Sequence, residues 1–368
     1  MSRLVGRAVA AAARRPVCDC VTGSATVADA AAAAERRLAV LAPHLVEPFR
    51  LALPAAVASV SRRLAQALWR EDVGPRRRLG TVVRRYGFDR VELALPDGVD
   101  PVRLLPVSVL DRRGWGLVAE LADAVVNLAI GYARAGPAVG VPAADPVDPD
   151  GAALAVERLA VEGHNLHPCA RTRLGWGVAD VLAHDLESGA TQVVFVAVPR
   201  DCHVGDDVGE ALAQVYPQVP PAPAGYVRLP VHPWQLDAVL RRRWPQLVRP
   251  LPGGLPAQPT ASLRTVLLPP GVDGRRRYVK LSLDVQITST RRSVSVASVR
   301  NGPVLSRLLH RLVSEDPAGG RVLLLAETAG AALGVGSGRD ASVILREGLG
   351  GRLARGEMAV PGGALPAR

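Results

Sequence analysis

Two histidines, a carboxylate and two arginines stand close together near the middle of the chain and could bind an anion. The string EGHNLHP covers residues 162–168 and contains His164 and His167, and Arg171 and Arg173 follow it. Guanidinium groups bind carboxylates and phosphates, and an imidazole can transfer a proton near neutral pH. Two alternatives are a structural loop and a zinc site, although the histidines lack the i, i+4 spacing of the common metalloprotease motif.

Hydroxyl and cationic side chains form a second candidate anion site. Ser262, Arg264 and Thr265 fall within one turn, and Lys280, the only lysine of the chain, follows. Hydroxyl groups and fixed cations can orient and neutralise a polyphosphate, and a lysine offers a compact ammonium group that arginine does not mimic. No Walker loop accompanies them, because the run GVGSG at residues 334–338 lacks the following lysine. These residues alone indicate a general anion site.

The segment that carries the lysine is predicted to be one β-strand. Over residues 278–288 apolar and polar residues alternate, which is the pattern of a strand with one buried face. Because successive side chains on a strand point to opposite faces, Lys280 and Thr288 are expected to share a face. Arg291 and Arg292 follow and would add positive charge nearby.

A third histidine, His232, lies in the string HPWQ at residues 232–235. Because it stands between a predicted strand and a proline, its backbone is restricted on both sides. Such a position suits a functional site or a structural corner, and the residues alone favour the corner.

The elements that must position these residues change character along the chain. Helical periodicity of apolar residues predicts helices at residues 27–42, 55–70 and 117–135. The prolines within residues 136–151 predict a linker or domain boundary. Further along, strands are predicted at residues 191–198, 226–231 and 321–327, and a helix at residues 303–313. The last segment, residues 348–368, has no periodicity and resembles the start of an unfinished domain.

The composition indicates a soluble globular protein. The net charge is +11, but the arginine clusters are separated by acidic or apolar stretches and lack aromatic neighbours for base stacking. Nucleic-acid binding is therefore kept only as an alternative. The four cysteines fit neither a disulfide framework nor a metal cage, and no apolar stretch approaches the roughly 20 residues of a membrane span. A cytoplasmic protein that contacts neither nucleic acid nor membrane is expected.

Taken in order, these strings resemble those of the IucA/IucC family, the aerobactin synthetase-like enzymes that make siderophores independently of peptide synthetases. The family is similar in the strings EGHxxHP, HPWQ and SxRT, and in a Lys-Leu strand that leads to Ile-Thr and an arginine, here residues 280–292. The resemblance runs from about residue 150 to Glu347. The preceding region agrees only in its helical character.

The resemblance implies an α+β fold with three parts, of which this chain would contain two. A helical thumb-like domain would occupy residues 1–145, and a fingers-like domain with a mainly antiparallel β-sheet would occupy residues 146–347 and bind ATP and carboxylate. The palm domain would follow residue 368 and be absent, which would leave residues 348–368 as an unfinished segment and the chain incomplete.

The resemblance also implies siderophore biosynthesis by an ATP-dependent acid-amine ligase. A carboxylate of citrate or a related polycarboxylate would attack the α-phosphate of Mg-ATP, giving an acyl-adenylate and pyrophosphate, and an amine would then attack the activated carbonyl. The Mg²⁺ ligands are expected in the absent palm. The partners would be these small molecules and, because family members are often dimers, a second copy of the chain. The alternative is a non-catalytic remnant that binds nucleotide or carboxylate.

Particular residues take their roles from the same resemblance. The groups expected to contact ATP phosphates are Ser262, Arg264, Thr265 and Lys280. Those expected in catalysis are His164, His167 and Arg292. Those expected to bind the substrate carboxylate are Thr288, Arg292 and Arg171. At Arg171 the family commonly has lysine, and the change keeps the charge but alters the geometry.

Overall fold

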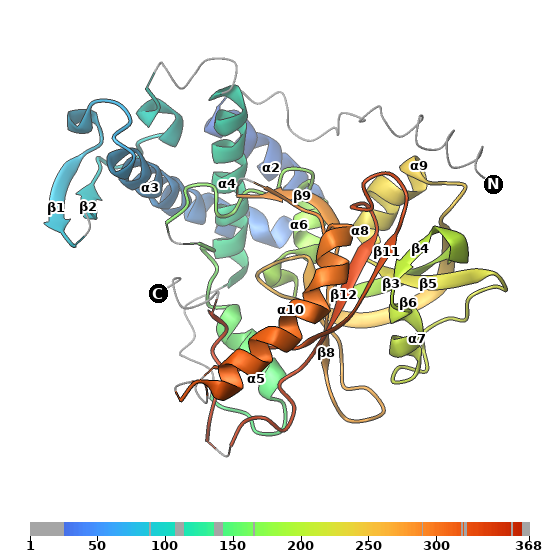
Figure 1. Ribbon diagram of the computed structural model, residues 1–368. Coiled ribbons are helices and arrows are strands. Elements are labelled where there is room, and N and C mark those ends of the chain that lie inside the picture. Colours follow the sequence, from blue (N-terminus) through green and yellow to red (C-terminus); the bar gives the residue numbers. More distant parts are fainter. Residues whose placement is uncertain are drawn as a thin grey trace.

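A helical part and a β-sheet part lie side by side in the computed structural model (Figure 1). The structure describes residues 26–87, 90–106, 114–135, 143–164, 166–288, 290–317, 319, 322–354 and 356–362. Within these residues every paired strand is antiparallel to its neighbour. The predicted α+β class, with helices first and an antiparallel sheet later, is confirmed.

Three long helices pack around one apolar core in the helical part: α2 (Val27–Leu41), α3 (Val46–Arg70) and α4 (Gly114–Ala135). Thr26 is the N-cap of α2, because its hydroxyl accepts a hydrogen bond from the Asp29 amide at 3.1 Å. α3 begins earlier than predicted: the helix continues across Pro54, and the burial of Phe49 holds its first turns against the core. The three predicted helices are otherwise confirmed.

Shorter elements complete the helical part. The hairpin of β1 (Thr81–Arg85) and β2 (Val91–Ala94) lies at the end farthest from the sheet (Figure 1), and α6 (Val178–His184) packs against α2. Single 3-10 turns occur at η1 (Pro43–Leu45), η2 (Arg76–Arg78), η3 (Pro101–Leu104) and η5 (Leu186–Ser188).

The helix α4 corrects one prediction. Its segment Gly116–Ala135 is long and apolar enough to cross a membrane by length and composition, although no such stretch was expected. The carboxylates of Glu120 and Asp123 interrupt the apolar run in the sequence. Most of this segment is buried against α2 and α3, as in the core helix of a soluble protein.

Eight strands form one sheet in the order β4-β11-β12-β8-β7-β6-β3-β5. Their bounds are β3 (Thr191–Pro199), β4 (His203–Gly205), β5 (Tyr226–Val231), β6 (Arg249–Pro259), β7 (Thr265–Leu267), β8 (Arg277–Leu281), β11 (Glu327–Leu333) and β12 (Ser342–Glu347). One face is buried in a core that contains Phe195, Val279 and Leu345. The strands predicted at 191–198 and 226–231 are confirmed. The strand predicted at 321–327 is wrong, because residues 322–326 are irregular and β11 begins at Glu327.

Helices and turns surround this sheet. They are α5 (Pro149–Glu157), α7 (Val208–Ala213), α8 (Pro233–Gln235), the π-turn η7 (Leu236–Leu240), α9 (Arg241–Arg243), α10 (Val296–Glu315) and the 3-10 turn η6 (Arg200–Cys202). α10 covers part of the second face, where Val299 packs on Ile344. It begins earlier than predicted, because Ser295 caps it by accepting from the Ser298 amide and Pro303 is tolerated inside it.

The predicted linker is wrong over its last three residues. Pro149 occupies the first turn of α5, where its missing amide hydrogen costs nothing, and the Asp148 side chain caps that helix. Residues 136–142 lie outside the described residues, as do Cys18 and Cys20. α5 also anchors part of the final segment, because the Leu349 amide donates to the Asp150 carboxylate.

The predicted continuous strand over residues 278–288 is divided into two. β8 ends at Leu281, and β9 (Leu283–Ile287) pairs with β10 (Thr290–Arg292) in a separate ribbon. Ser282 fixes the break, since its hydroxyl exchanges hydrogen bonds with the backbone of Val294. The apolar residues of β8 enter the sheet core and those of β9 enter the helical core. Lys280 therefore lies in the eight-stranded sheet, whereas Thr288 directly follows β9 in the two-stranded ribbon. The two residues do not share one face of one strand.

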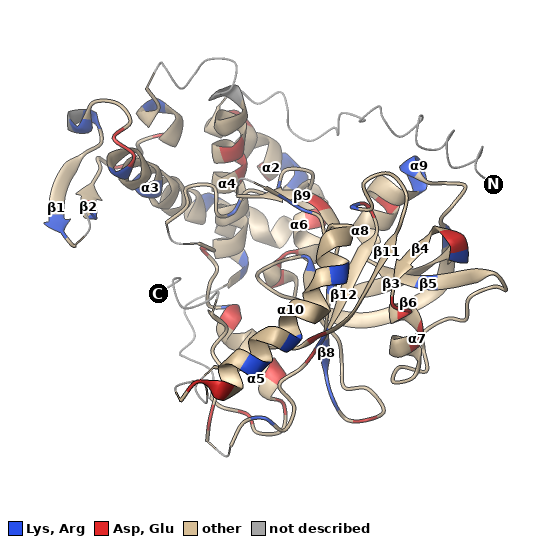
Figure 2. Ribbon diagram, viewed as in Figure 1, with Lys and Arg blue, Asp and Glu red and all other residues tan. Residues whose placement is uncertain are grey.

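Charged side chains are distributed over both parts of the molecule (Figure 2). Several arginines of the sequence clusters pair with local carboxylates, such as Arg241 with Asp237 and Arg277 with Asp273. Cationic side chains that have no such carboxylate partner are therefore the ones that can bind an anionic ligand.

Candidate functional site

The hydroxyl-rich turn is a rigid unit beside the sheet. The Ser262 hydroxyl accepts from the Thr265 amide at 3.2 Å, and the Thr260 hydroxyl donates to the Thr265 carbonyl at 3.0 Å. Between them Leu263 is buried with a φ of +61°, a backbone conformation that non-glycine residues rarely adopt. The buried side chain holds this conformation in place, so the turn presents Arg264 in a fixed direction.

The turn leads directly to the lysine. Thr265 on β7 is the cross-strand partner of Lys280 on β8, so the two side chains project from the same face of the sheet. The Leu281 amide also donates to the Arg264 carbonyl at 2.7 Å. The structure thus brings together all four residues predicted to contact phosphates, including Ser262.

Two residues missed by the sequence analysis complete this cluster. Glu327 on β11 accepts from the Lys280 ammonium at 3.3 Å and from two nitrogens of Arg346 on β12 at 2.6 and 2.9 Å. The register pairs Glu327 with Arg346 directly. Little in the sequence indicates these two residues as part of a site. Arg346 is a charged residue at the end of an otherwise apolar run, and Glu327 is the last residue of the strand that was wrongly predicted at residues 321–327.

Arg264 adds to an excess of positive charge. Its guanidinium donates to the Ser293 carbonyl at 3.1 Å and has no carboxylate partner within the described residues. Burial lowers the pKa of Arg264, and the nearby Arg292 and Arg346 lower it further. Burial and Arg346 likewise lower the pKa of Lys280. The half-buried cations Arg264, Lys280 and Arg346 therefore gather around the carboxylate of Glu327, and Arg292 lies close to Arg264. We call Arg264, Lys280, Arg346 and Glu327 the cationic cradle.

The histidine string approaches the cradle through Arg292. Nδ1 of His164 accepts from the Leu166 amide and Nδ1 of His167 accepts from the Cys169 amide, which leaves Nε2 of each ring to carry the proton. Burial lowers the pKa of His167, and the charges of His164 and Arg292 lower it further. His167 is thus held as a neutral imidazole beside a guanidinium. Asn165 lies outside the described residues.

The carboxylate of the same string has a different role. Glu162 pairs with Arg63 on α3 and accepts from the hydroxyl of Tyr132 on α4, and the Ser59 hydroxyl donates to it at 3.2 Å. Burial and this carboxylate raise the pKa of Tyr132 to about 12. Glu162 therefore fastens the histidine loop to the helical part.

The two predicted carboxylate-binding positions on the hairpin lie together. The Arg292 guanidinium donates to the Thr288 hydroxyl at 3.2 Å, and Thr288 has a φ of +56°. Both side chains are only half-buried. The β9-β10 hairpin thus presents a hydroxyl and a guanidinium next to the cradle.

Arg171, predicted to bind substrate, is instead inside the protein. Only 2% of its surface is exposed, and its guanidinium donates to Asp185 at 3.2 Å and to Glu187 at 3.0 Å. Arg173 donates to the same Asp185 carboxylate at 2.9 Å. Burial alone would raise the pKa of Asp185, but the two guanidinium groups hold it at about 2. In this geometry Arg171 stabilises the fold and does not reach a substrate.

The string HPWQ forms a structural corner. Nδ1 of the buried His232 accepts from the Trp234 amide at 3.2 Å and so caps α8. The buried Gln235 side chain donates to the Asp340 carbonyl at 2.7 Å and accepts from the Asp284 amide at 2.8 Å. Gln235 therefore ties the loop before β12 to β9, and through β9 to the hairpin that carries Arg292. Its positioning role was missed because Gln235 lies far from both partners in the sequence.

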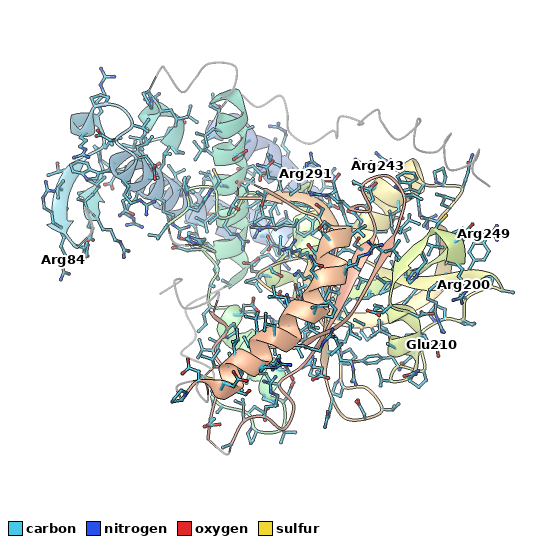
Figure 3. The ribbon with its side chains drawn as sticks, viewed as in Figure 1. Arg84, Arg200, Glu210, Arg243, Arg249 and Arg291 are labelled. Atoms are coloured by element: carbon cyan, nitrogen blue, oxygen red, sulfur yellow. The ribbon has the colours of Figure 1, made fainter. Side chains whose placement is uncertain are left out.

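Ion pairs reinforce this corner. The Asp284 carboxylate pairs with Arg243 at 3.4 Å and with Arg291 at 2.6 Å, and Arg243 also pairs with Asp340 at 2.7 Å. Figure 3 shows Arg243 and Arg291 at the same end of the molecule, near α9 and β9. Strand β9, which follows the break at Ser282, is thus held through Asp284 by Arg243 of α9 and by Arg291 of β10.

A hollow of about 320 Å³ opens on the outside of the corner. It is lined by residues that include Asp180, His184, Trp234, Asp237 and Arg242. None of the residues predicted for catalysis or binding lines it, so we assign it no part in the candidate site.

Metal ligands do not converge in the described part of the chain. No group of three or more His, Cys, Asp or Glu side chains there is arranged to hold an ion. Cys169 and Cys202 are separate buried thiols, and burial raises the pKa of both. The one carboxylate of the cradle is already paired with two cations.

The structure is thus that of an α+β protein with an antiparallel sheet on which Lys280 and Arg346 share the carboxylate of Glu327. Residues 152–367 match the model of the IucA / IucC family. Because the match covers more than half of the sequence, the chain belongs to the IucA / IucC family. One similar protein is the D-ornithine–citrate ligase of Staphylococcus aureus, which is 26% identical over 183 residues, or 44% of this chain and 28% of that protein.

Solved structures support the same fold. The petrobactin biosynthesis protein AsbB of Bacillus anthracis superposes with a TM-score of 0.68 at 18% identity, covering 86% of this chain and 63% of AsbB. The aerobactin synthetase IucC of Klebsiella pneumoniae gives a TM-score of 0.62 at 17% identity, covering 84% and 63%. At this identity the likeness concerns the fold. The chain spans less than two thirds of these proteins and about a third of the curated relatives that it matches.

Proposed function

We propose that this chain binds ATP and a polycarboxylate at the cationic cradle and takes part in the ATP-dependent joining of that acid to an amine during siderophore biosynthesis. The observation that carries the proposal is the cradle itself, in which three half-buried cations face one carboxylate and a fourth, Arg292, lies close by. Such an arrangement is costly unless a multiply charged anion completes it. The name of the D-ornithine–citrate ligase supports an acid and an amine as the substrates.

The phosphate contacts follow from the geometry of the cradle. The turn of Ser262 and Thr265 offers hydroxyl groups, and Arg264 and Lys280 offer charge-assisted hydrogen bonds to the phosphate oxygens. As a carboxylate oxygen bonds to the α-phosphorus, the bond to the β-phosphate oxygen breaks and pyrophosphate leaves. The cations stabilise the negative charge that builds up at both ends of this exchange.

The hairpin would hold the acid, and the histidine loop would contact the nucleotide. Thr288 and Arg292 would hold the substrate carboxylate beside the α-phosphate, since they lie together next to the cradle. His164 or His167, each with Nδ1 engaged by a backbone amide, would contact the nucleotide through Nε2. The amine then attacks the acyl-adenylate carbonyl and AMP leaves.

Mg²⁺ neutralises phosphate charge when it is bound with ATP. Because the described residues offer no converging group of metal ligands, we propose that its protein ligands come from polypeptide outside them. The greater length of AsbB and IucC supports this division. We also propose a cytoplasmic location, where ATP is available, and small molecules rather than nucleic acid as partners. A homodimer remains our proposal for the assembly.

A second candidate is a non-catalytic role at the same cradle, whose cations account for anion binding alone equally well. In that case the chain binds ATP there without forming an adenylate. Two measurements separate the candidates: calorimetric titration with ATP, and trapping of acyl-hydroxamate with hydroxylamine over a panel of carboxylic acids. Binding with product supports the ligase, and binding without product supports the non-catalytic protein. Absence of ATP binding by folded protein, or unchanged binding after Lys280→Ala, contradicts both.

A further inference from the structure

Glu327 is the only anion of the cationic cradle, and the cations themselves hold it. Its Oε1 atom accepts from the Lys280 ammonium and from Nε and Nη2 of Arg346. Within the described residues no other group donates to this carboxylate. A phosphate oxygen would use the same donors, because ammonium and guanidinium groups bind phosphate and carboxylate alike.

The surroundings of Glu327 leave room for its carboxylate. Oε2 lies over Gly302 of α10, where an added Cβ would be only 2.3 Å from this oxygen. The Glu327 amide donates to the hydroxyl of Ser306 on the same helix at 3.0 Å, which fixes the backbone independently of the side chain. Because this amide contact does not involve the side chain, the carboxylate can change its partners without moving β11.

Electrostatics requires an anion at this position in the absence of ligand. Arg264, Lys280 and Arg346 are half-buried close together, and the charge of Arg346 lowers the pKa of both Arg264 and Lys280. Glu327 stays ionised there: burial raises its pKa, but Arg346 and Lys280 outweigh that effect and lower it. One negative charge thus keeps the unliganded cations folded side by side.

We propose that Glu327 is an internal counter-anion that occupies a phosphate position of the cradle and is displaced from Lys280 and Arg346 when a polyphosphate binds. Arg346 is then a further phosphate-binding residue. The inference rests on the proposed function, because it assumes a polyphosphate ligand. Its consequence is a competition: every bound phosphate group must replace the attraction of Glu327, which weakens binding of the nucleotide and speeds release of pyrophosphate.

The test is the affinity of Glu327→Gln for inorganic pyrophosphate and for ATP, measured by calorimetric titration. The amide keeps the size and one acceptor but removes the competing charge, so both ligands are expected to bind at least about tenfold more tightly. Arg346→Gln is expected to bind both at least about tenfold more weakly. Glu327→Asp keeps the charge and should stay close to the unmodified protein, which covers the case in which the amide variant folds poorly.

A matched control is Glu210→Gln. Glu210 on α7 is also a glutamate paired with an arginine, Arg228, but its side chain is about half exposed, and Figure 3 shows it on the side of the sheet part that faces away from the helical part. The same loss of one negative charge there should leave both affinities unchanged.

The remaining outcomes are decisive in different ways. Equal or weaker binding by Glu327→Gln, with normal binding by the unmodified chain, overturns the counter-anion and leaves the proposed function standing. If neither protein binds pyrophosphate or ATP, both proposals fail. Equal strengthening by Glu210→Gln would mean that overall charge, and not the position of Glu327, governs the affinity.

Discussion

The substitution Asp185→Asn is expected to destabilise the fold strongly. Asp185 is fully buried and accepts from Arg171 at 3.2 Å, from Arg173 at 2.9 Å and from the Leu186 amide at 2.7 Å. An asparagine would preserve the shape but leave Arg171 to Glu187 alone and Arg173 without a carboxylate. Removing one partner of a buried ion pair costs about 3–5 kcal/mol, a large part of the roughly 5–15 kcal/mol that stabilises a typical domain.

The pKa of Asp185 reflects the same interaction. It is about 2 in the folded protein, against an ordinary value of 3.8, because Arg171 and Arg173 stabilise the ionised carboxylate more than burial destabilises it. The ion pairs therefore favour the folded state when Asp185 is ionised. Because the folded pKa is the lower one, this stability is present above pH 3.8 and is lost as the pH falls toward 2.

Urea denaturation followed by tryptophan fluorescence measures the change in the free energy of unfolding. The control is Asp237→Asn, which breaks an exposed pair with Arg241 on one turn and should have no measurable effect. A loss below about 1 kcal/mol in Asp185→Asn would refute the reasoning, because it would show that water replaces the lost carboxylate.

Three further substitutions test other parts of the structure. Gln235→Leu leaves the Asp284 amide and the Asp340 carbonyl unpaired, so we expect about 2 kcal/mol lower stability by urea denaturation. We also expect weaker citrate binding by calorimetry, and an unchanged citrate affinity would contradict the positioning role of Gln235. Burial and His184 lower the pKa of His232 to about 3. As the pH falls, the unfolded chain therefore binds a proton at this histidine before the folded protein does, and the free energy of unfolding should decrease from about pH 6.5 toward pH 3. If that free energy depends on pH just as steeply in His232→Gln, this histidine is not the cause. The double change Leu305→Gln with Leu308→Gln should alter the melting temperature little, because both side chains are about half exposed, and a large loss would show that α10 is packed more closely than described.

Local patterns were sufficient to predict much of the fold. The helices α2 and α4 were found from the periodicity of their apolar residues, and the strands β3 and β5 were found from short continuous runs rich in β-forming residues. Prolines caused the errors at α3, α5 and α10, since a proline was taken as a boundary where tertiary packing or a first-turn position tolerates it.

The candidate site was predictable only where its residues are close in sequence. Ser262, Arg264 and Thr265 share one turn, so their strings identified them. Glu327 and Arg346 come from strands far along the chain, and only the sheet register brings them to Lys280. The sequence also gives no sign that Arg171 is buried, since the same guanidinium serves a buried ion pair or a substrate equally well.

The break at Ser282 connects the two halves of the proposed chemistry. A continuous strand would have kept Lys280 and Thr288 on one face of the sheet, separated by the rise of eight residues, or roughly 27 Å. The break instead turns β9 into a hairpin against the helical part, and Gln235 and Asp284 hold it there. Arg292 thereby returns close enough to Arg264 to lower its pKa. A carboxylate can attack an α-phosphate only when both are held within a few ångström. The proposed common site for acid and nucleotide is therefore geometrically feasible because the alternating segment is divided at Ser282, with β8 in the sheet core and β9 in the helical core.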